Sequence, residues 1–276
     1  MSLPFTKAER WLDAHSGDVD LNKISNPISV SGEEQVDIPG RGGSKAGQYD
    51  FAFRFRGTDG KDLEGNGRLF LPVRRPRERI PVIISMHYEM DINGSARFLR
   101  RGMAVMTPHG PRSYTASNLM GHGVNHSVAM AQLPRRMPFI DQDRVVLFGG
   151  SAGGYHALMA SSFVFPLTAV YAAVPPLNLK FNMNYIRIND GYNKKPGDPA
   201  QPAAPVVRAV LTIAEETAKG GNPDGENWNQ LSPVFRTDFM TFPTAMTYVT
   251  ADALVPVCQL SPDLVRVPPT GMWPEG

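Results

Sequence analysis

The segment that most constrains the fold of this chain lies between Arg144 and Gly154 and reads RVVLFGGSAGG. An apolar stretch typical of a buried strand leads into Gly149-x-Ser151-x-Gly153, and small and apolar residues typical of a helix follow. A strand that turns directly into a helix needs small residues at the turn, because larger side chains would hold the two elements apart. The pattern therefore predicts a sharp turn with Ser151 at its tip, at the positive end of the helix dipole.

Such a turn makes Ser151 a candidate nucleophile, because its hydroxyl is exposed while nearby backbone N–H groups stabilise developing negative charge. A dinucleotide-binding loop fits poorly because Ser151 takes the place of its second glycine, and a P-loop fits poorly because no Gly-Lys-Ser/Thr is present. A glycine-rich packing turn without chemistry is the remaining alternative. All residues that flank Ser151 are small, as close packing of the strand on the helix requires: Gly149, Gly150, Ala152, Gly153 and Gly154.

Apolar segments alternate with helical patterns through most of the chain. Continuous apolar runs such as 80–86 are typical of parallel strands that are buried on both faces. The alternation predicts a mostly parallel sheet with helices on both faces and a ligand site at the carboxyl ends of the strands. We expect strands at 80–86, 103–107, 145–148, 167–174 and 243–250, and helices within 113–134, at 152–163 and from an N-cap at Ser95 to 101, closed by Gly102.

The regions before and between these elements have a different character. Residues 49–55 and 67–71 alternate in polarity around a turn at 58–60, which predicts an antiparallel hairpin. We divide the chain into an N-terminal arm at 1–47, with a helix at 5–15 followed by an irregular polar stretch, and one domain at 48–276. Within that domain, residues 175–240 hold long loops and a helix at 206–219. These loops exceed the usual connection of about 2–6 residues, which indicates function or mobility.

Composition narrows the possible partners and compartments. The net charge of +2 is spread along the chain, which argues against nucleic-acid binding. No apolar run reaches the roughly 18–20 residues of a membrane span, so we expect no membrane partner. No signal peptide is visible, which favours the cytoplasm and leaves open a secreted protein whose signal has been removed. A single cysteine, Cys258, excludes an intramolecular disulfide.

A metal site is the other chemistry that the sequence raises. His122 and His126 lie four residues apart, which places them on one helix face, but Gly123 stands where a zinc hydrolase has glutamate. We therefore expect packed or solvated histidines, no metal and no cofactor.

Several motifs together carry a family resemblance across residues 48–260. They are TDG at 58–60 with GRLFLP at 67–72, PVIISMH at 81–87, RGMAVMTP at 101–108, DRVVLFGGSAGG at 143–154, and TADALVP at 250–256 with Gln259. In these motifs the chain resembles the α/β-hydrolase superfamily, in the branch of prolyl-oligopeptidase-like, dienelactone-hydrolase-like and acetyl-xylan-esterase-like proteins. The resemblance implies a three-layer α/β sandwich around a mostly parallel twisted sheet, with an N-terminal antiparallel hairpin and a lid-like insert.

The resemblance also implies a set of site residues. Ser151 would be the nucleophile and Asp252, after the last predicted strand, the triad acid that orients a histidine. The backbone N–H groups of Ala152 and Tyr88 would form the oxyanion hole. Where many family members have His-Gly-Gly, this chain has His87-Tyr88-Glu89, so the ring of Tyr88 could instead line the substrate pocket. His87, Tyr88 and Trp228 are the predicted substrate-binding residues.

The histidine of the triad is the departure from the family pattern. The chain has six histidines and none follows Asp252, where the family places its base: His15, His87, His109, His122, His126 and His156. Three explanations stay open. The chain stops short of the histidine, which its Pro-rich last residues favour; His87 or His109 substitutes; or catalysis has been lost.

These observations predict a serine hydrolase that cleaves carboxylic esters of small molecules through an acyl-enzyme on Ser151. A prolyl-oligopeptidase-like serine peptidase is the alternative, weakened because the chain has no room for a propeller domain. An inactive relative that binds a ligand or partner in the same cleft is a further alternative. The oligomeric state stays open.

Overall fold

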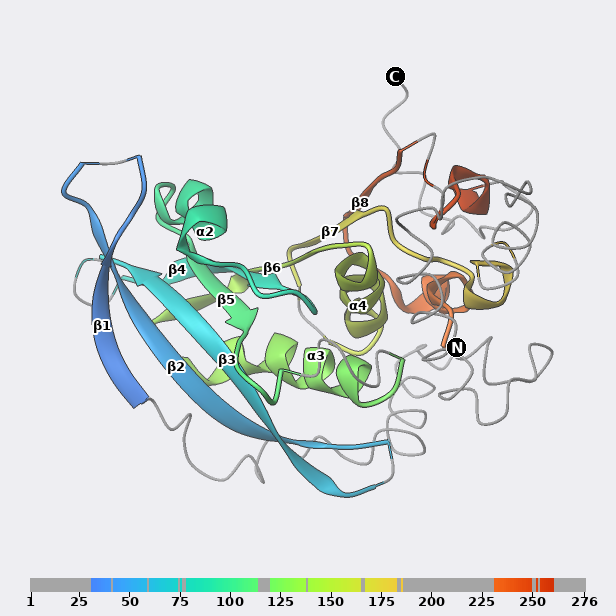
Figure 1. The fold of residues 1–276 in the computed structure, drawn as a ribbon, viewed down its shortest axis with the longest axis horizontal. Coiled ribbons are helices and arrows are strands. Elements are labelled where there is room, and N and C mark those ends of the chain that lie inside the picture. The colour runs from blue at the N-terminus through green and yellow to red at the C-terminus, as the bar shows by residue number, and fades with distance from the viewer. Residues whose placement is uncertain are drawn as a thin grey trace, which may run out of the picture.

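The computed structural model describes most of the chain between residues 31 and 260 (Figure 1). The described residues are 31–40, 42–58, 60–73, 75, 78–113, 120–137, 139–164, 167–182, 185, 231–249, 252 and 254–260. The predicted helices at 5–15 and 206–219 and the predicted binding residue Trp228 lie outside them.

Eight strands of the described residues form one sheet in the order β1-β2-β3-β5-β4-β6-β7-β8. Antiparallel pairing joins β1, β2, β3 and β5, and parallel pairing joins β5, β4, β6, β7 and β8. The strands are β1 (Ser31–Asp37), β2 (Lys45–Arg56), β3 (Asp62–Pro72), β4 (Ile80–Ser85), β5 (Ala104–Pro108), β6 (Ile140–Gly150), β7 (Ala169–Ala173) and β8 (Thr244–Thr247).

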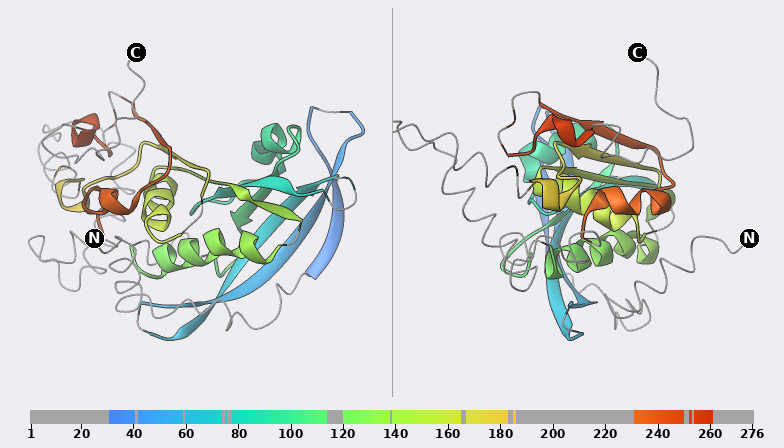
Figure 2. Two further views of the ribbon diagram at one scale, coloured as in Figure 1. Left: turned by 180° about the vertical axis from the view of Figure 1, so that it is seen from behind. Right: turned by 90° about the vertical axis from the view of Figure 1, so that its right-hand side faces the viewer.

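Helices cover both faces of this sheet, as Figures 1 and 2 show. Ile83 and Ile84 are neighbours on β4 and therefore point to opposite faces. Ile83 packs in one apolar cluster with Leu99 of α2 (Ile92–Leu99), and Ile84 packs in another with Val128 of α3 (His122–Gln132) and Leu158 of α4 (Ala152–Ser161). The structure is thus the three-layer α/β sandwich that the sequence predicts.

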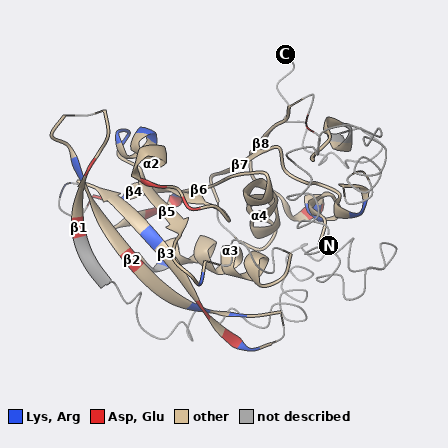
Figure 3. Cartoon of the chain, in the orientation of Figure 1, with Lys and Arg blue, Asp and Glu red and all other residues tan. Residues whose placement is uncertain are grey.

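The helices α3 and α4 carry no charged residue, and Figure 3 shows both in a single neutral colour. Every residue of α4 and all of α3 after His122 are buried. A helix that is apolar or neutral on all sides needs burial on all sides. The element that follows Ser151 is therefore part of the core, which fixes the serine rigidly.

The antiparallel hairpin is confirmed and is longer than predicted. Residues Phe51, Phe53 and Phe55 of β2 alternate with less buried neighbours and point into the core cluster that holds α3. The predicted irregularity of residues 31–37 is wrong, because this stretch forms β1 and pairs with β2. Its sequence, SGEEQVD, has no apolar alternation, so its strand form rests on pairing rather than on burial.

The start of α2 also differs from the prediction. The N-cap is Asp91, whose side chain accepts a hydrogen bond from the Gly94 N–H at 2.8 Å. Ser95, the predicted cap, lies inside the helix and is fully buried. The end is as predicted, since Gly102 takes a φ of 73°.

Short 3-10 helices complete the described chain: η1 (Leu133–Arg136), η2 (Pro233–Phe239) and η3 (Val257–Leu260). Within the predicted insert at 175–240, the structure describes 175–182, 185 and 231–240. The Tyr155 hydroxyl of α4 donates to the Leu231 carbonyl at 2.9 Å, which joins the end of this insert to the core. In the described part of the chain, no helix is both long and apolar enough to cross a membrane.

Candidate active site

Ser151 lies at the predicted sharp turn, between the last residue of β6 and the first residue of α4. Its backbone has φ 51° and ψ −121°, a conformation that residues with side chains disfavour. Its N–H donates to the Ala173 carbonyl of β7 at 2.8 Å, which ties the turn to the neighbouring strand. The serine hydroxyl makes no hydrogen bond to any described residue.

Close packing explains two of the flanking glycines. A Cβ at Gly149 would overlap the backbone of Gly153, and a Cβ at Gly153 would lie 2.5 Å from the Met86 carbonyl oxygen. Gly150 differs, because its Cβ would meet nothing closer than Ala173 at 3.9 Å. The expectation that packing requires a small residue at every flanking position is therefore wrong at Gly150.

Residues with a strained backbone conformation lie at the carboxyl edge of the sheet. Three non-glycine residues of the described chain have positive φ: His87 at 66°, Ser151 at 51° and Val174 at 45°. They follow β4, β6 and β7, which are neighbours in the sheet. Such residues cost about 1–3 kcal/mol each and cluster at functional sites. The strain marks this edge as the candidate active site.

The first turn of α4 presents backbone N–H groups beside Ser151. No described side chain caps this helix, and its first turn holds no acidic residue. The positive end of the helix dipole is therefore available to an anion. Ala152, the first of the two predicted oxyanion donors, is the first residue of this turn, and its assignment stays a prediction.

Tyr88, the second predicted donor, already uses its N–H. It donates to the Met86 carbonyl at 2.7 Å and closes a three-residue turn around His87, whose positive φ suits such a turn. The turn lies against the elbow, since the Tyr88 ring would be 3.4 Å from a Cβ at Gly153. Tyr88 N–H reaches an oxyanion only by sharing its bond to Met86, so this assignment also stays a prediction.

Two buried hydroxyl groups hold the loop at 86–91. The Ser85 hydroxyl donates to the Tyr88 carbonyl at 3.0 Å, and Thr107 Oγ1 accepts from the Met90 N–H at 2.7 Å. Thr107 is fully buried at the end of β5, beside β4. Sequence reasoning missed both residues, because each is a single hydroxyl at the end of an apolar strand, and the signal depends on strand pairing.

His87 packs inward rather than lining an open surface. Its ring is buried, lies edge-on to His156 of α4 at 4.8 Å between centroids, and contacts the half-exposed ring of Tyr88. Burial lowers the pKa of the His87 imidazole to about 4, so the ring is neutral at pH 7. Nδ1 of His156 lies 2.9 Å from the hydroxyl oxygen of Ser127.

His109, the other substitute that the sequence suggests for the missing base, sits in a charged cluster. Its Nδ1 lies 2.6 Å from Glu89 Oε1, and its Nε2 lies 2.6 Å from a guanidinium nitrogen of Arg68. Arg68 also forms two bonds to Asp50, which lower the pKa of that carboxyl group. These contacts position Glu89 and engage both ring nitrogens of His109.

Asp252 lies beyond the end of β8, on the same edge of the sheet as Ser151. Its Oδ1 accepts from the N–H groups of Leu254 at 2.8 Å and Val255 at 2.9 Å, which shapes the loop that follows. No described residue bonds Oδ2. The carboxylate thus organises its own loop, and its role as a triad acid stays a prediction.

Hydrogen bonds join the loop that contains Asp252 to the segment after β7. The buried Gln259 side chain accepts from the N–H groups of Leu177 and Asn178, and the buried Asn182 amide donates to the Leu254 carbonyl at 2.6 Å. Gln259, which belongs to the last family motif in the sequence, and Asn182 therefore both stabilise the structure of this region.

The histidine pair of α3 is packed. His122 Nδ1 accepts from the Thr58 N–H at 3.0 Å, and the His126 ring packs against Phe53 and Phe55. Burial lowers the pKa of His126 to about 3. The two rings connect α3 with the β2–β3 hairpin, His122 at its turn and His126 on β2.

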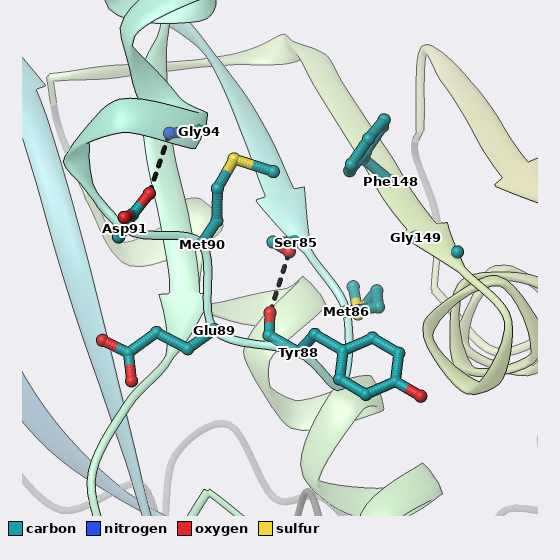
Figure 4. A pocket seen from close by; sticks show the side chains of 10 residues that line it. Ser85, Met86, Tyr88, Glu89, Met90, Asp91, Gly94, Phe148 and Gly149 are labelled. Atoms are coloured by element: carbon teal, nitrogen blue, oxygen red, sulfur yellow. Dashed lines mark hydrogen bonds between the residues drawn. The ribbon is translucent and has the colours of Figure 1, made fainter. Parts of the chain in front are cut away.

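A pocket of about 450 Å³ opens beside the elbow, between the carboxyl ends of β4 and β6 and the start of α2 (Figure 4). The strands β4 and β6 are neighbours in the sheet. The chain runs from β4 to β5 on one side of β4 and then crosses to β6 on the other side, so the strand order reverses between β4 and β6. Open α/β sheets bind ligands at such points. The pocket is lined by Ser85, Met86, Tyr88, Glu89, Met90, Asp91, Gly94, Phe148, Gly149 and Gly150.

Comparisons with solved structures agree with this architecture. The acylaminoacyl peptidase of Pyrococcus horikoshii aligns at 17% identity over 77% of this chain and 33% of its own, with a TM-score of 0.55. Acetyl xylan esterase 1 from Thermoanaerobacterium sp. JW/SL YS485 aligns at 14% identity over 93% and 86%, with a TM-score of 0.54. The cell wall degrading esterase LipA from Xanthomonas oryzae aligns at 13% identity over 82% and 84%, with a TM-score of 0.52.

These similarities define the fold. The chain has the α/β-hydrolase fold, as its motifs predict, and it spans a third to a half of the length of the acylaminoacyl peptidases it matches. No protein-family model matches the sequence, and no curated protein matches it.

Proposed function

We propose that this chain is a serine hydrolase that cleaves carboxylic esters of small molecules through an acyl-enzyme on Ser151. The observation that carries the proposal is the strained Ser151 at the uncapped start of α4, locked by glycine packing at the switch point of the sheet. Strained residues cluster at functional sites, so we assign to this conformation the presentation of the Ser151 hydroxyl group.

In the proposed reaction, Ser151 Oγ attacks the ester carbonyl carbon and its proton passes to a base. The carbonyl oxygen becomes an oxyanion that the N–H of Ala152 stabilises, with Tyr88 N–H as the second donor. Collapse of this intermediate expels the alcohol and leaves the acyl group on Ser151. Water then cleaves that ester, which releases the carboxylic acid and restores the serine.

Ester cleavage and peptide cleavage differ in whether they need a group that first accepts and then donates a proton. No described histidine forms a hydrogen bond with the Ser151 side chain. An alkoxide or phenolate leaves without being protonated, whereas an amine must be protonated to leave, which requires a general acid. This favours ester cleavage over the peptidase alternative that the acylaminoacyl peptidase neighbours suggest.

Hydrolysis of p-nitrophenyl acetate tests the proposal, with Ser151→Ala as the control. We expect hydrolysis that depends on Ser151 and is faster than in the variant, with a rate that rises with pH as hydroxide takes up the proton of the serine. An inflection in the pH profile would instead indicate that a titrating group of the protein serves as the base, and equal rates in both proteins would contradict the proposal.

The inactive-relative alternative predicts a different outcome. Such a protein would hydrolyse no ester above the Ser151→Ala background but would still bind a ligand at the carboxyl edge.

A further inference from the structure

Gly150 is the one glycine of the elbow that packing does not explain. It has no positive φ, so its backbone does not require glycine. A Cβ there would have ordinary contacts at 3.9 Å, whereas a Cβ at Gly149 would overlap the backbone of Gly153. Gly150 ends a β-strand, where glycine is less favourable than residues with side chains. The missing side chain therefore needs another reason.

The direction of Gly150 supplies that reason. Side chains alternate along β6, and Val146 and Phe148 pack on the α2 face of the sheet. Gly150 shares that face, which is where the pocket of about 450 Å³ opens. Gly149 faces α4 with Leu147. A side chain at 150 would fill the pocket, while one at 149 would break the elbow.

The walls of this pocket suit an apolar, uncharged group. Met90 and Phe148 form apolar walls on the α2 face, and the thioether side chain of Met90 adapts to ligands of varied shape. Asp91 lies beside α2, and Glu89 lies further along the same loop, as Figure 4 shows. The hydrogen bond from Gly94 lowers the pKa of Asp91 and keeps it ionised, so the charge of Asp91 disfavours an anionic ligand.

We propose that this pocket binds the alkyl chain of the acyl group, and that glycine at position 150 keeps it open. The inference rests on the proposed function, because Gly150 is bonded directly to Ser151, which carries the acyl group in the acyl-enzyme. Volumes of about 300–1,000 Å³ are usual for small-molecule sites, so the pocket can hold a short to medium chain.

A series of p-nitrophenyl esters tests the pocket through turnover. Each buried methylene contributes about fourfold to binding. We expect kcat/KM of the unchanged protein to rise about fifteenfold from acetyl to butyryl. Gly150→Val, which suits a strand, should lower the butyryl-to-acetyl ratio of kcat/KM at least tenfold. Equal losses for both esters, or no change of the ratio, would overturn the assignment.

A binding measurement separates this inference from the proposed function. Hexanamide, a neutral probe, is titrated into Ser151→Ala and into Ser151→Ala with Gly150→Val, and binding is followed by NMR. Hexanamide binding that weakens at least tenfold with valine supports the pocket even if no ester is cleaved. Absence of binding to Ser151→Ala, or equal binding to both proteins, would overturn the pocket even if Ser151 hydrolyses esters.

Discussion

Two strand-to-helix connections meet at the carboxyl edge, and they are held in different ways. Between β6 and α4 only Ser151 intervenes, and glycine backbones in direct contact fix the turn. Between β4 and α2 lies the loop at 86–91, which side-chain hydroxyl groups and the Asp91 cap hold in place. The first connection rests on steric fit, and the second rests on hydrogen bonds. The two should therefore respond differently to substitution and to pH.

The largest effect is expected from Gly149→Ala, which breaks the steric connection. Its Cβ would overlap backbone atoms of Gly153, which cannot rotate away. Overpacking of this kind costs about 3 kcal/mol or more. Urea unfolding should show that loss, while Gly150→Ala should stay within about 0.5 kcal/mol of the unchanged protein. Equal losses for the two variants would contradict the difference in their packing.

The pH dependence of stability sharpens the comparison on the side of the loop. The pKa of buried His87 is about 4 in the folded protein, below its ordinary value of 6.5, so the unfolded chain takes up the proton first as pH falls. The contribution of the neutral His87 ring to the free energy of unfolding is complete above pH 6.5 and is lost between pH 6.5 and 4. We expect about 2 kcal/mol of this loss between pH 7 and 5.

Unfolding by urea at the two pH values measures this loss, and His87→Asn is the control because asparagine tolerates positive φ. His126, whose pKa in the folded protein is about 3, also lowers the stability as pH falls, and this contribution remains in His87→Asn. An unchanged pH dependence in His87→Asn would contradict the burial of a neutral imidazole at position 87.

A smaller effect is expected from Thr107→Val, which removes a hydrogen bond of the loop. The Met90 N–H would lose its acceptor in a buried place, at a cost of about 1–3 kcal/mol. Thr107→Ser keeps the hydroxyl group and should restore most of the difference. Hydrogen exchange at the Met90 amide measures the local effect, and unchanged protection in Thr107→Val would show that the hydroxyl does not hold the loop.

The smallest effect is a gain. Ser151→Gly should relieve the strain at φ 51° and stabilise the protein by about 1 kcal/mol, while Ser151→Ala keeps its Cβ and should gain nothing. Thermal unfolding of the two variants compares them directly. A loss of stability in Ser151→Gly would mean that the serine conformation is not strained.

The same contrast explains how much the sequence alone could predict. The elbow is local, since Gly149, Ser151 and Gly153 lie within five positions. Their spacing alone therefore indicates that the strand and the helix pack closely. The loop depends on tertiary pairing, because Thr107 reaches Met90 only through the pairing of β4 with β5. The cap at Asp91 was missed for a related reason, since Asp91 and Ser95 are both good cap residues and only the final backbone decides between them.

Other parts of the fold follow the same division. The apolar runs at 80–86 and 145–148 predicted β4 and the core of β6, because burial on both faces leaves a clear pattern. The polar strand β1 has no such apolar pattern in its sequence. The role of Gly150 was also hidden, because a glycine that packs closely and a glycine that leaves a pocket open look alike in a sequence.

The central claim is that Ser151 is a nucleophile, and covalent labelling tests it most directly. The protein and its Ser151→Ala variant are incubated with an alkyl fluorophosphonate, and the modified peptide is located by mass spectrometry. The account predicts one phosphonyl group per chain, attached to Ser151, and none on the variant. Labelling elsewhere, or equal labelling of both proteins, would contradict it.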